Sequence, residues 1–115
     1  MAALVAITPT NLGTVNAGAA VASTDTIAQS VLGPKGAYLE IINGNASSDI
    51  VTISDSGATA AGNALSTGSV TDTVVNGTSQ IFYISPTQVN PSTGLVTVTH
   101  TVTATVTYKL YPNGV

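Results

Sequence analysis

The sequence predicts an all-β protein that folds as a single β-sandwich domain of about seven or eight antiparallel strands. The strongest observation is the segment LVTVTHTVTATVTYKL at residues 95–110, where apolar residues recur at even positions and threonine or lysine occupies the odd positions from Thr97 onward. Successive side chains of a strand point to opposite faces, so this period of two indicates β structure with one buried face. Short β-prone segments separated by turn residues along the rest of the chain, with no convincing helix, favour a sandwich.

The N-terminal third contains weaker signals. Residues 4–7 are predicted to form a short strand or an extended arm that ends at Pro9 and the turn signal at residues 11–13. Residues 16–23 are rich in alanine and glycine without periodicity, so we expect a loop, with one short helical turn as the alternative. Residues 26–32 are predicted to form a strand that stops at Gly33 and Pro34.

The middle of the chain suggests two hairpins. Residues 37–42, with Leu39 and Ile41 on one face, are expected to pair with residues 50–54 across a turn that Asn43 and Gly44 open. Residues 70–75 and 79–84 are expected to pair across Asn76 and Gly77. The small polar residues 56–68 between the hairpins are predicted to form a long surface loop.

The C-terminal third contains a connection and the alternating segment. Pro86 and Pro91 make residues 85–94 a connection. The alternating segment is much longer than the five or six residues of a typical strand, so we expect it to bend or break near His100 or Ala104.

The length of 115 residues indicates one domain, residues 1–115, with residues 1–13 as an N-terminal arm or edge strand. The chain has no cysteine, which excludes disulfides and thiol catalysis. The N-terminus lacks the layout of a signal peptide, and the apolar stretches are far shorter than the ~20 residues of a transmembrane helix, so we expect no membrane partner.

The charge balance restricts the partners further. Two lysines stand against five acidic residues, for a formal charge of −3, and charged residues make up only 6% of the chain. Nucleic acid is therefore not expected as a partner, because phosphate binding needs clustered cations. A surface with so little charge favours association with neighbouring molecules. The alternative is a secreted or cell-surface domain with a threonine-rich exterior.

No combination of residues suggests catalysis or a cofactor. His100 is the only histidine and has only threonines beside it in the sequence, so we expect a half-buried or sheet-edge residue and not a general base. Asp49, Asp55 and Asp72 lack the spacing of calcium ligands and are expected to cap turns. We therefore expect no enzyme activity, no cofactor and no metal.

The chain has five aromatic residues and no tryptophan. Most of them are expected to fill the core, which gives little support to a sugar-stacking surface. Tyr111 lies outside the even-numbered apolar face, beside Pro112, and we keep it as a candidate contact residue.

Several segments resemble the small all-β capsid decoration proteins of tailed bacteriophages, notably those of phages that infect actinobacteria. The resemblance covers most of the chain and is carried by the following segments: MAA at 1–3, ITPTNLG at 7–13, AYLEIING at 37–44, IVTI at 50–53, GLVTV at 94–98 and TVTYKL at 105–110. It implies a structural protein that binds the outer surface of an assembled capsid, with the major capsid protein as partner, and reinforces the contacts between capsomers. It also implies a homo-oligomer, with a trimer favoured.

The N-terminal arm is the element we expect to make contacts. Leu4, Val5 and Ile7 belong to an uncharged apolar segment of the kind that pairs with another chain when it lies at a sheet edge. We predict that they contact a neighbouring subunit or the capsid; the alternative is pairing within the domain as an edge strand. The alternative function is a carbohydrate-binding module of a phage tail, a fibre or a cell surface, acting through loops such as residues 56–68.

Overall fold

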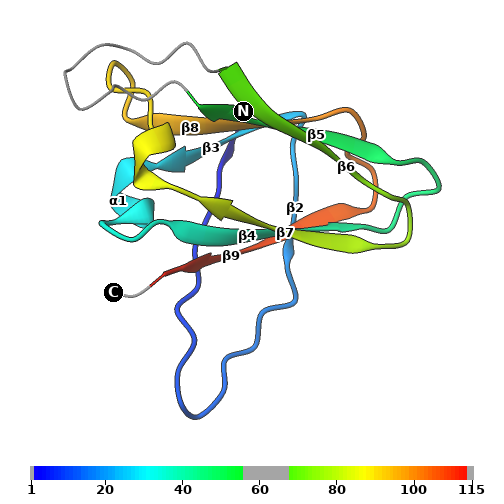
Figure 1. Cartoon of the computed structure of the whole chain (residues 1–115). Helices are drawn as coiled ribbons and strands as arrows, with labels where there is room; N and C mark the ends of the chain where they lie inside the picture. The colour runs from blue at the N-terminus through cyan, green and yellow to red at the C-terminus, as the bar shows by residue number, and fades with distance from the viewer. Residues whose placement is uncertain (1, 56–67, 114–115) are drawn as a thin grey trace.

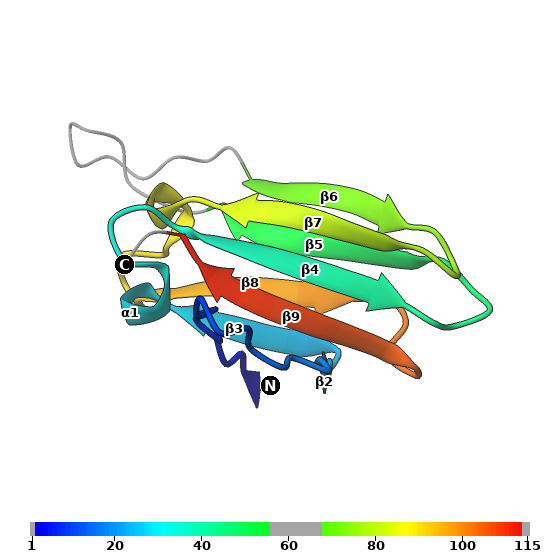
Figure 2. The ribbon, with the colours of Figure 1, turned by 90° about the horizontal axis from the view of Figure 1, so that it is seen from below.

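The computed structural model describes residues 2–55 and 68–113, which form a sandwich of two β-sheets (Figure 1). The five-stranded sheet has the order β1-β3-β8-β5-β6. The four-stranded sheet has the order β2-β9-β4-β7 (Figure 2). The predicted fold class is confirmed. The strands are β1 (Ala2–Ala3), β2 (Ala19–Ala20), β3 (Thr24–Ala28), β4 (Ala37–Asn43), β5 (Asp49–Asp55), β6 (Gly68–Val74), β7 (Ser79–Ile84), β8 (Leu95–His100) and β9 (Val106–Pro112).

The core lies between the two sheets and is built by alternation along each strand. Leu39 and Ile41 of β4 are fully buried, as are Val96 and Val98 of β8 in the opposite sheet. Thr97 and Thr99, which alternate with the buried residues of β8, are only partly buried. The predicted assignment of Leu39 and Ile41 to one face is confirmed, because the period of two places them together on the inward face.

The alternating segment at residues 95–110 is divided between the two sheets. It forms β8 up to His100 and resumes as β9 at Val106, so the predicted break is confirmed. The chain turns at Thr105, a non-glycine residue with a φ of 56°. β8 pairs with β3 and β5, whereas β9 pairs with β2 and β4. One sequence pattern therefore supplies a strand to each layer of the sandwich.

Neither of the predicted hairpins forms. β4 pairs with β7 and β9, whereas β5 pairs with β6 and β8, so the turn after Asn43 carries the chain from one sheet to the other. Asn76 and Gly77 do form a tight turn, in which the Thr78 N–H donates to the Val75 carbonyl at 3.1 Å, but this turn also connects the two sheets. Both predicted hairpins are crossovers between layers.

The side chain of Asn43 explains how these crossovers are held together. It is buried, and its Nδ2 donates to the carbonyls of Ser47 at 2.9 Å and Val74 at 3.0 Å. Its main-chain carbonyl accepts from the Gly77 N–H at 2.8 Å. Asn43 thus bonds to both crossovers. In a tight hairpin turn, the turn residues would bond within the turn and would not need contacts with a second connection.

Two further predictions near the N-terminus are wrong. Residues 16–23 contain the short strand β2, whose Ala19 and Ala20 pair with Tyr108 and Thr107 of β9. The predicted strand at residues 26–32 ends at Ala28 and continues as the single-turn helix α1 (Gln29–Leu32). The helix buries Leu32 over one end of the core. The surface loop predicted at residues 56–68 lies outside the described residues except for Gly68, which begins β6.

The predicted connection at residues 85–94 contains one turn of 3-10 helix, η1 (Pro86–Gln88). It begins with a capping box: the Ser85 hydroxyl accepts from the Thr87 N–H, and the Gln88 side chain accepts from the Ser85 N–H at 2.8 Å. Such reciprocal capping satisfies donors at the start of a helix.

Gly36 and Gly77 offer a matched test of local packing. Both have a left-handed φ, +79° and +77°, but a Cβ at Gly36 would lie 2.2 Å from the Ile84 carbonyl oxygen, whereas a Cβ at Gly77 meets nothing within 4 Å. We expect Gly77→Ala to lower the free energy of unfolding by about 1–2 kcal/mol, the cost of the conformation alone. Gly36→Ala should cost at least ~2 kcal/mol more, because β7 must move. Urea denaturation of both variants measures the difference, and equal losses would contradict the packing at Gly36.

Candidate functional site

The N-terminal arm, residues 4–7, crosses the side of the sandwich from one sheet to the other (Figure 1). The Leu4 N–H donates to Thr26 of β3 at 2.8 Å, and the Ile7 N–H donates to Leu110 of β9 at 2.9 Å. Between them, the Val5 N–H donates to the Tyr108 hydroxyl at 3.0 Å. Main-chain hydrogen bonds therefore tie the arm to both layers.

The structure does not gather the four predicted contact residues into one patch. Leu4 is buried in the domain core, and Ile7 is half-buried. Val5 is 68% exposed, so it is the arm residue that can reach a partner. Tyr111 lies on the outer face of the four-stranded sheet and is partly buried. The stretch before the arm, Ala2 and Ala3, pairs in parallel with β3 as an edge strand.

The loop between the arm and β2 carries the most exposed apolar side chains among the described residues. Residues 8–17 project well beyond the sandwich (Figure 1). Leu12 is 92% exposed and Val15 is 93% exposed. The tip is closed by its own hydrogen bonds: the Gly13 N–H donates to the Thr10 carbonyl at 3.1 Å, and the Thr10 N–H donates to the Thr14 hydroxyl at 3.0 Å.

Sequence reasoning missed Leu12 and Val15. The available signal was two branched apolar residues inside a turn-rich segment that has no periodicity, so that no regular element could bury them. Isolated exposed apolar residues are ordinary on protein surfaces. Leu12 and Val15, in contrast, lie together on one projecting loop that has its own hydrogen bonds.

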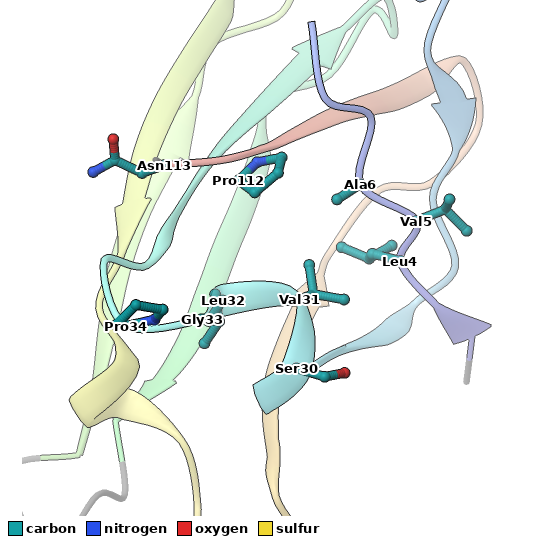
Figure 3. A pocket seen from close by; sticks show the side chains of 10 residues that line it. All are labelled: Leu4, Val5, Ala6, Ser30, Val31, Leu32, Gly33, Pro34, Pro112 and Asn113. Carbon is teal, nitrogen blue, oxygen red and sulfur yellow. The ribbon is translucent and has the colours of Figure 1, made fainter. Parts of the chain in front are cut away.

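An open apolar cavity of about 560 Å³ lies where the arm meets α1 and the end of β9 (Figure 3). Its walls include Leu4 and Val5 of the arm and Val31 of α1, and no charged side chain lines it. Asn113 is the amide at its rim, and its Nδ2 donates to the Lys35 carbonyl at 3.2 Å. Small-molecule sites combine an apolar wall with several convergent polar groups. Here only Ser30 and Asn113 contribute polar side chains to the lining.

Three tyrosines form a row across the outer face of the four-stranded sheet. Tyr38 of β4 pairs in register with Tyr83 of β7 on one side and with Tyr111 of β9 on the other. The rings of Tyr38 and Tyr83 are 5.7 Å apart and inclined at 53°. Tyr38 is 43% exposed and Tyr83 is 51% exposed.

This row corrects the prediction that most of the aromatic residues fill the core. Only Phe82 and Tyr108 are buried, while three of the five aromatic rings lie on the outer face. The register decides the outcome, because the odd-numbered Tyr83 and Tyr111 pair with the outward-facing Tyr38.

His100 has a partner that its sequence neighbours do not reveal. The Nδ1 atom lies 2.6 Å from the Asp49 carboxylate at the start of β5, and both side chains are fully buried. The other Asp49 oxygen accepts from the N–H groups of Thr101 at 3.0 Å and Val102 at 3.2 Å. The Asp49 side chain thus holds the end of β8 and the first residues of the irregular segment that follows it.

A carboxylate that orients a histidine also occurs in catalytic sites, where the second ring nitrogen must reach a substrate or a nucleophile. Here the His100 Nε2 is buried and has no hydrogen-bond partner among the described residues. The geometry is therefore that of a structural pair. The predicted half-buried or edge position is wrong, since β8 lies between β3 and β5 inside its sheet.

The described residues also offer neither a metal site nor a membrane-spanning helix. Within residues 2–55 and 68–113, no three His, Asp or Glu side chains are placed to hold a metal ion. In the same part of the chain, no helix has the length and apolar character needed to cross a membrane. Comparison with protein-family models, curated proteins and solved structures finds no match for this chain.

The Asp49–His100 pair can be tested by its effect on stability. Asp49→Ala removes the acceptor of two backbone N–H groups and the partner of a buried ring nitrogen, so we expect the free energy of unfolding to fall by roughly 3–5 kcal/mol. Asp72→Ala is the control, because Asp72 is exposed and its contact with Gln80 should be worth less than about 1 kcal/mol. Chemical denaturation gives both values. A loss at Asp49 no larger than at Asp72 would show that the pair does not hold the strand ends.

Proposed function

We propose that this chain is a structural virion protein that binds the outer surface of an assembled phage capsid and reinforces the contacts between capsomers. The resemblance to small all-β decoration proteins supplies the class of particle, and the projecting loop with Leu12 and Val15 is the observation that supports adhesion. The major capsid protein is the proposed partner, and the outer capsid surface is the proposed location. No catalytic step is part of this function.

The physical mechanism is burial of apolar surface at many equivalent positions. Burying one leucine and one valine side chain contributes about 3–6 kcal/mol, which is modest for a single copy. On a symmetric particle, each copy that touches two capsomers resists their separation, and the contributions are repeated over the shell. The low charge of the chain leaves little electrostatic repulsion between neighbouring copies.

The projecting loop is a better place for mutations than the arm itself. Deleting the arm would remove the buried Leu4, so lost binding could not be separated from lost stability. Leu12 and Val15 are almost fully exposed, so their replacement should leave the fold intact.

We expect L12S and V15S each to weaken binding to capsids that lack the protein by about tenfold, and the double variant by about a hundredfold. Co-sedimentation with such capsids measures occupancy, and thermal unfolding should show an unchanged melting temperature. V75S is the control, since Val75 is 52% exposed in the turn between β6 and β7.

Two outcomes would contradict the proposal. In the first, the double variant decorates capsids at full occupancy. In the second, particles without the protein keep their heat tolerance while the protein is found in the tail.

Carbohydrate recognition is the second candidate, and the tyrosine row is the observation that favours it. Aromatic rings with an apolar face and a hydroxyl edge suit contact with sugars, and Tyr38 and Tyr83 present such surfaces outward. The loop at residues 56–68 does not enter this argument, because it lies largely outside the described residues.

A glycan array with purified protein tests this second candidate. If it is right, the protein binds a glycan, and Y38A and Y83A each weaken that binding at least tenfold. V75A should bind like the unmodified protein, because Val75 lies in the turn before β7. Consistent absence of glycan binding would remove carbohydrate recognition and leave the capsid proposal intact.

A further inference from the structure

Three of the four sheet edges of the sandwich are protected against pairing with another chain. β1 and β2, which end the two sheets on one side, are two residues long. β6, the opposite edge of the five-stranded sheet, carries Asp72 opposite the buried Val51. Asp72 therefore lies on the side of β6 that faces the other sheet, where it remains exposed at the margin of the sandwich and accepts from the Gln80 Nε2 at 2.5 Å. Very short edge strands and inward-pointing charges are recognised ways of blocking edge-to-edge association.

The fourth edge, β7, has no such protection. It runs for six residues with the sequence SQIFYI, which contains neither a charged residue nor a proline. On its outer face, Ile81 is 64% exposed and Tyr83 is 51% exposed. An edge strand that is this long, uncharged and apolar is a template for another strand.

The hydrogen-bond pattern shows which groups of β7 are available. The Asn43 N–H donates to Thr78 at 2.9 Å, and bonded pairs in an antiparallel ladder recur at every second residue. The pairs Ile41–Gln80, Leu39–Phe82 and Ala37–Ile84 are therefore the bonded ones between β4 and β7. The N–H and C=O groups of Ser79, Ile81 and Tyr83 consequently point away from β4. No hydrogen bond within residues 2–55 and 68–113 reaches them.

We propose that β7 pairs antiparallel with β7 of a second copy of this chain, about a two-fold axis at Ile81, to give a continuous eight-stranded sheet. Water bonds to these exposed backbone groups one at a time, whereas another strand bonds to the whole row of donors and acceptors along its length. In this register Ile81 faces Ile81 of the second copy, and Ser79 faces Tyr83, so all three outward-pointing residues are bonded. Shifting the register by two residues leaves part of this row unpaired.

A second copy is the occupant that the chemistry favours. The two-fold arrangement is self-complementary, as isologous interfaces require. Neither Ser79, Ile81 nor Tyr83 carries a charge that would select a partner of opposite charge. Pairing also covers Ile81, the most exposed residue of the strand's apolar set. This inference goes beyond the proposed function and does not depend on it.

The first experiment measures the mass of the full chain in solution by sedimentation. We expect the unmodified protein to form a dimer at micromolar concentrations and I81K to raise the dimer dissociation constant by about tenfold or more, because it places a charge at the centre of the pairing. I50K is the matched control, since Ile50 is 44% exposed on β5 in the other sheet, and this variant should remain dimeric.

The second experiment does not depend on the stability of I81K. The chain has no cysteine, so I81C introduces a single thiol. Directly opposed residues in a bonded antiparallel pair have Cα atoms about 5.5 Å apart, which is within the range of a disulfide. Oxidised glutathione takes up the two electrons and the two protons of the two thiols and becomes two molecules of reduced glutathione, while the two sulfur atoms join as a disulfide. A covalent dimer should form with I81C and not with I50C.

The results that would overturn the inference are distinct from those that test capsid binding. They are a monomer at hundreds of micromolar, an oligomer of any size that I81K leaves unchanged, or cross-linking that is no more efficient for I81C than for I50C. A trimer that persists in I81K would support the oligomer implied by the resemblance and exclude pairing through β7.

Discussion

Each sheet of this protein has one apolar face, and the two faces are removed from water only when the sheets pack against each other. The constraint is met by strands that mostly alternate between the two layers along the chain. β4 and β5 belong to different layers, as do β6 and β7 and also β8 and β9. The chain therefore crosses between layers at each of these three turns. Each crossing places consecutive strands on opposite sides of the core.

Crossing between layers places polar backbone groups at the ends of the core, and buried polar side chains satisfy several of them. Asn43 bonds to the crossovers that follow β4 and β6. Asp49 and His100 perform the same task where the chain leaves β8. A histidine beside a carboxylate is an arrangement that also occurs in catalytic sites. Here both side chains are buried and Asp49 bonds to the backbone, so the pair has a structural role.

The exterior has a different character from the core and from most protein surfaces. Threonine and serine cover much of it. Five of the eight large apolar side chains that are exposed among the described residues lie in two groups: Leu12 and Val15 on one loop, and Tyr38, Ile81 and Tyr83 on one sheet face. The loop and the β7 edge differ in the interaction that they offer. The loop presents apolar side chains, whereas the β7 edge presents backbone hydrogen-bond donors and acceptors. In the two proposals, the loop is therefore assigned to the capsid surface and the β7 edge to a neighbouring copy.

The alternation of apolar and hydroxyl residues determined by itself that the chain is all-β, which side chains of β4 and β8 face the core, and that residues 95–110 must break near His100. Such a pattern indicates which face of the strand each side chain is on. It does not indicate which other strand lies beside it. The tertiary structure alone decided that the turns after Asn43 and Val75 join different sheets, that Asp49 meets His100 across 51 residues of sequence, and that three tyrosines share the outer face. The physical reason is that strand partners are chosen by the packing of two whole sheets, which depends on contacts between residues far apart in the chain.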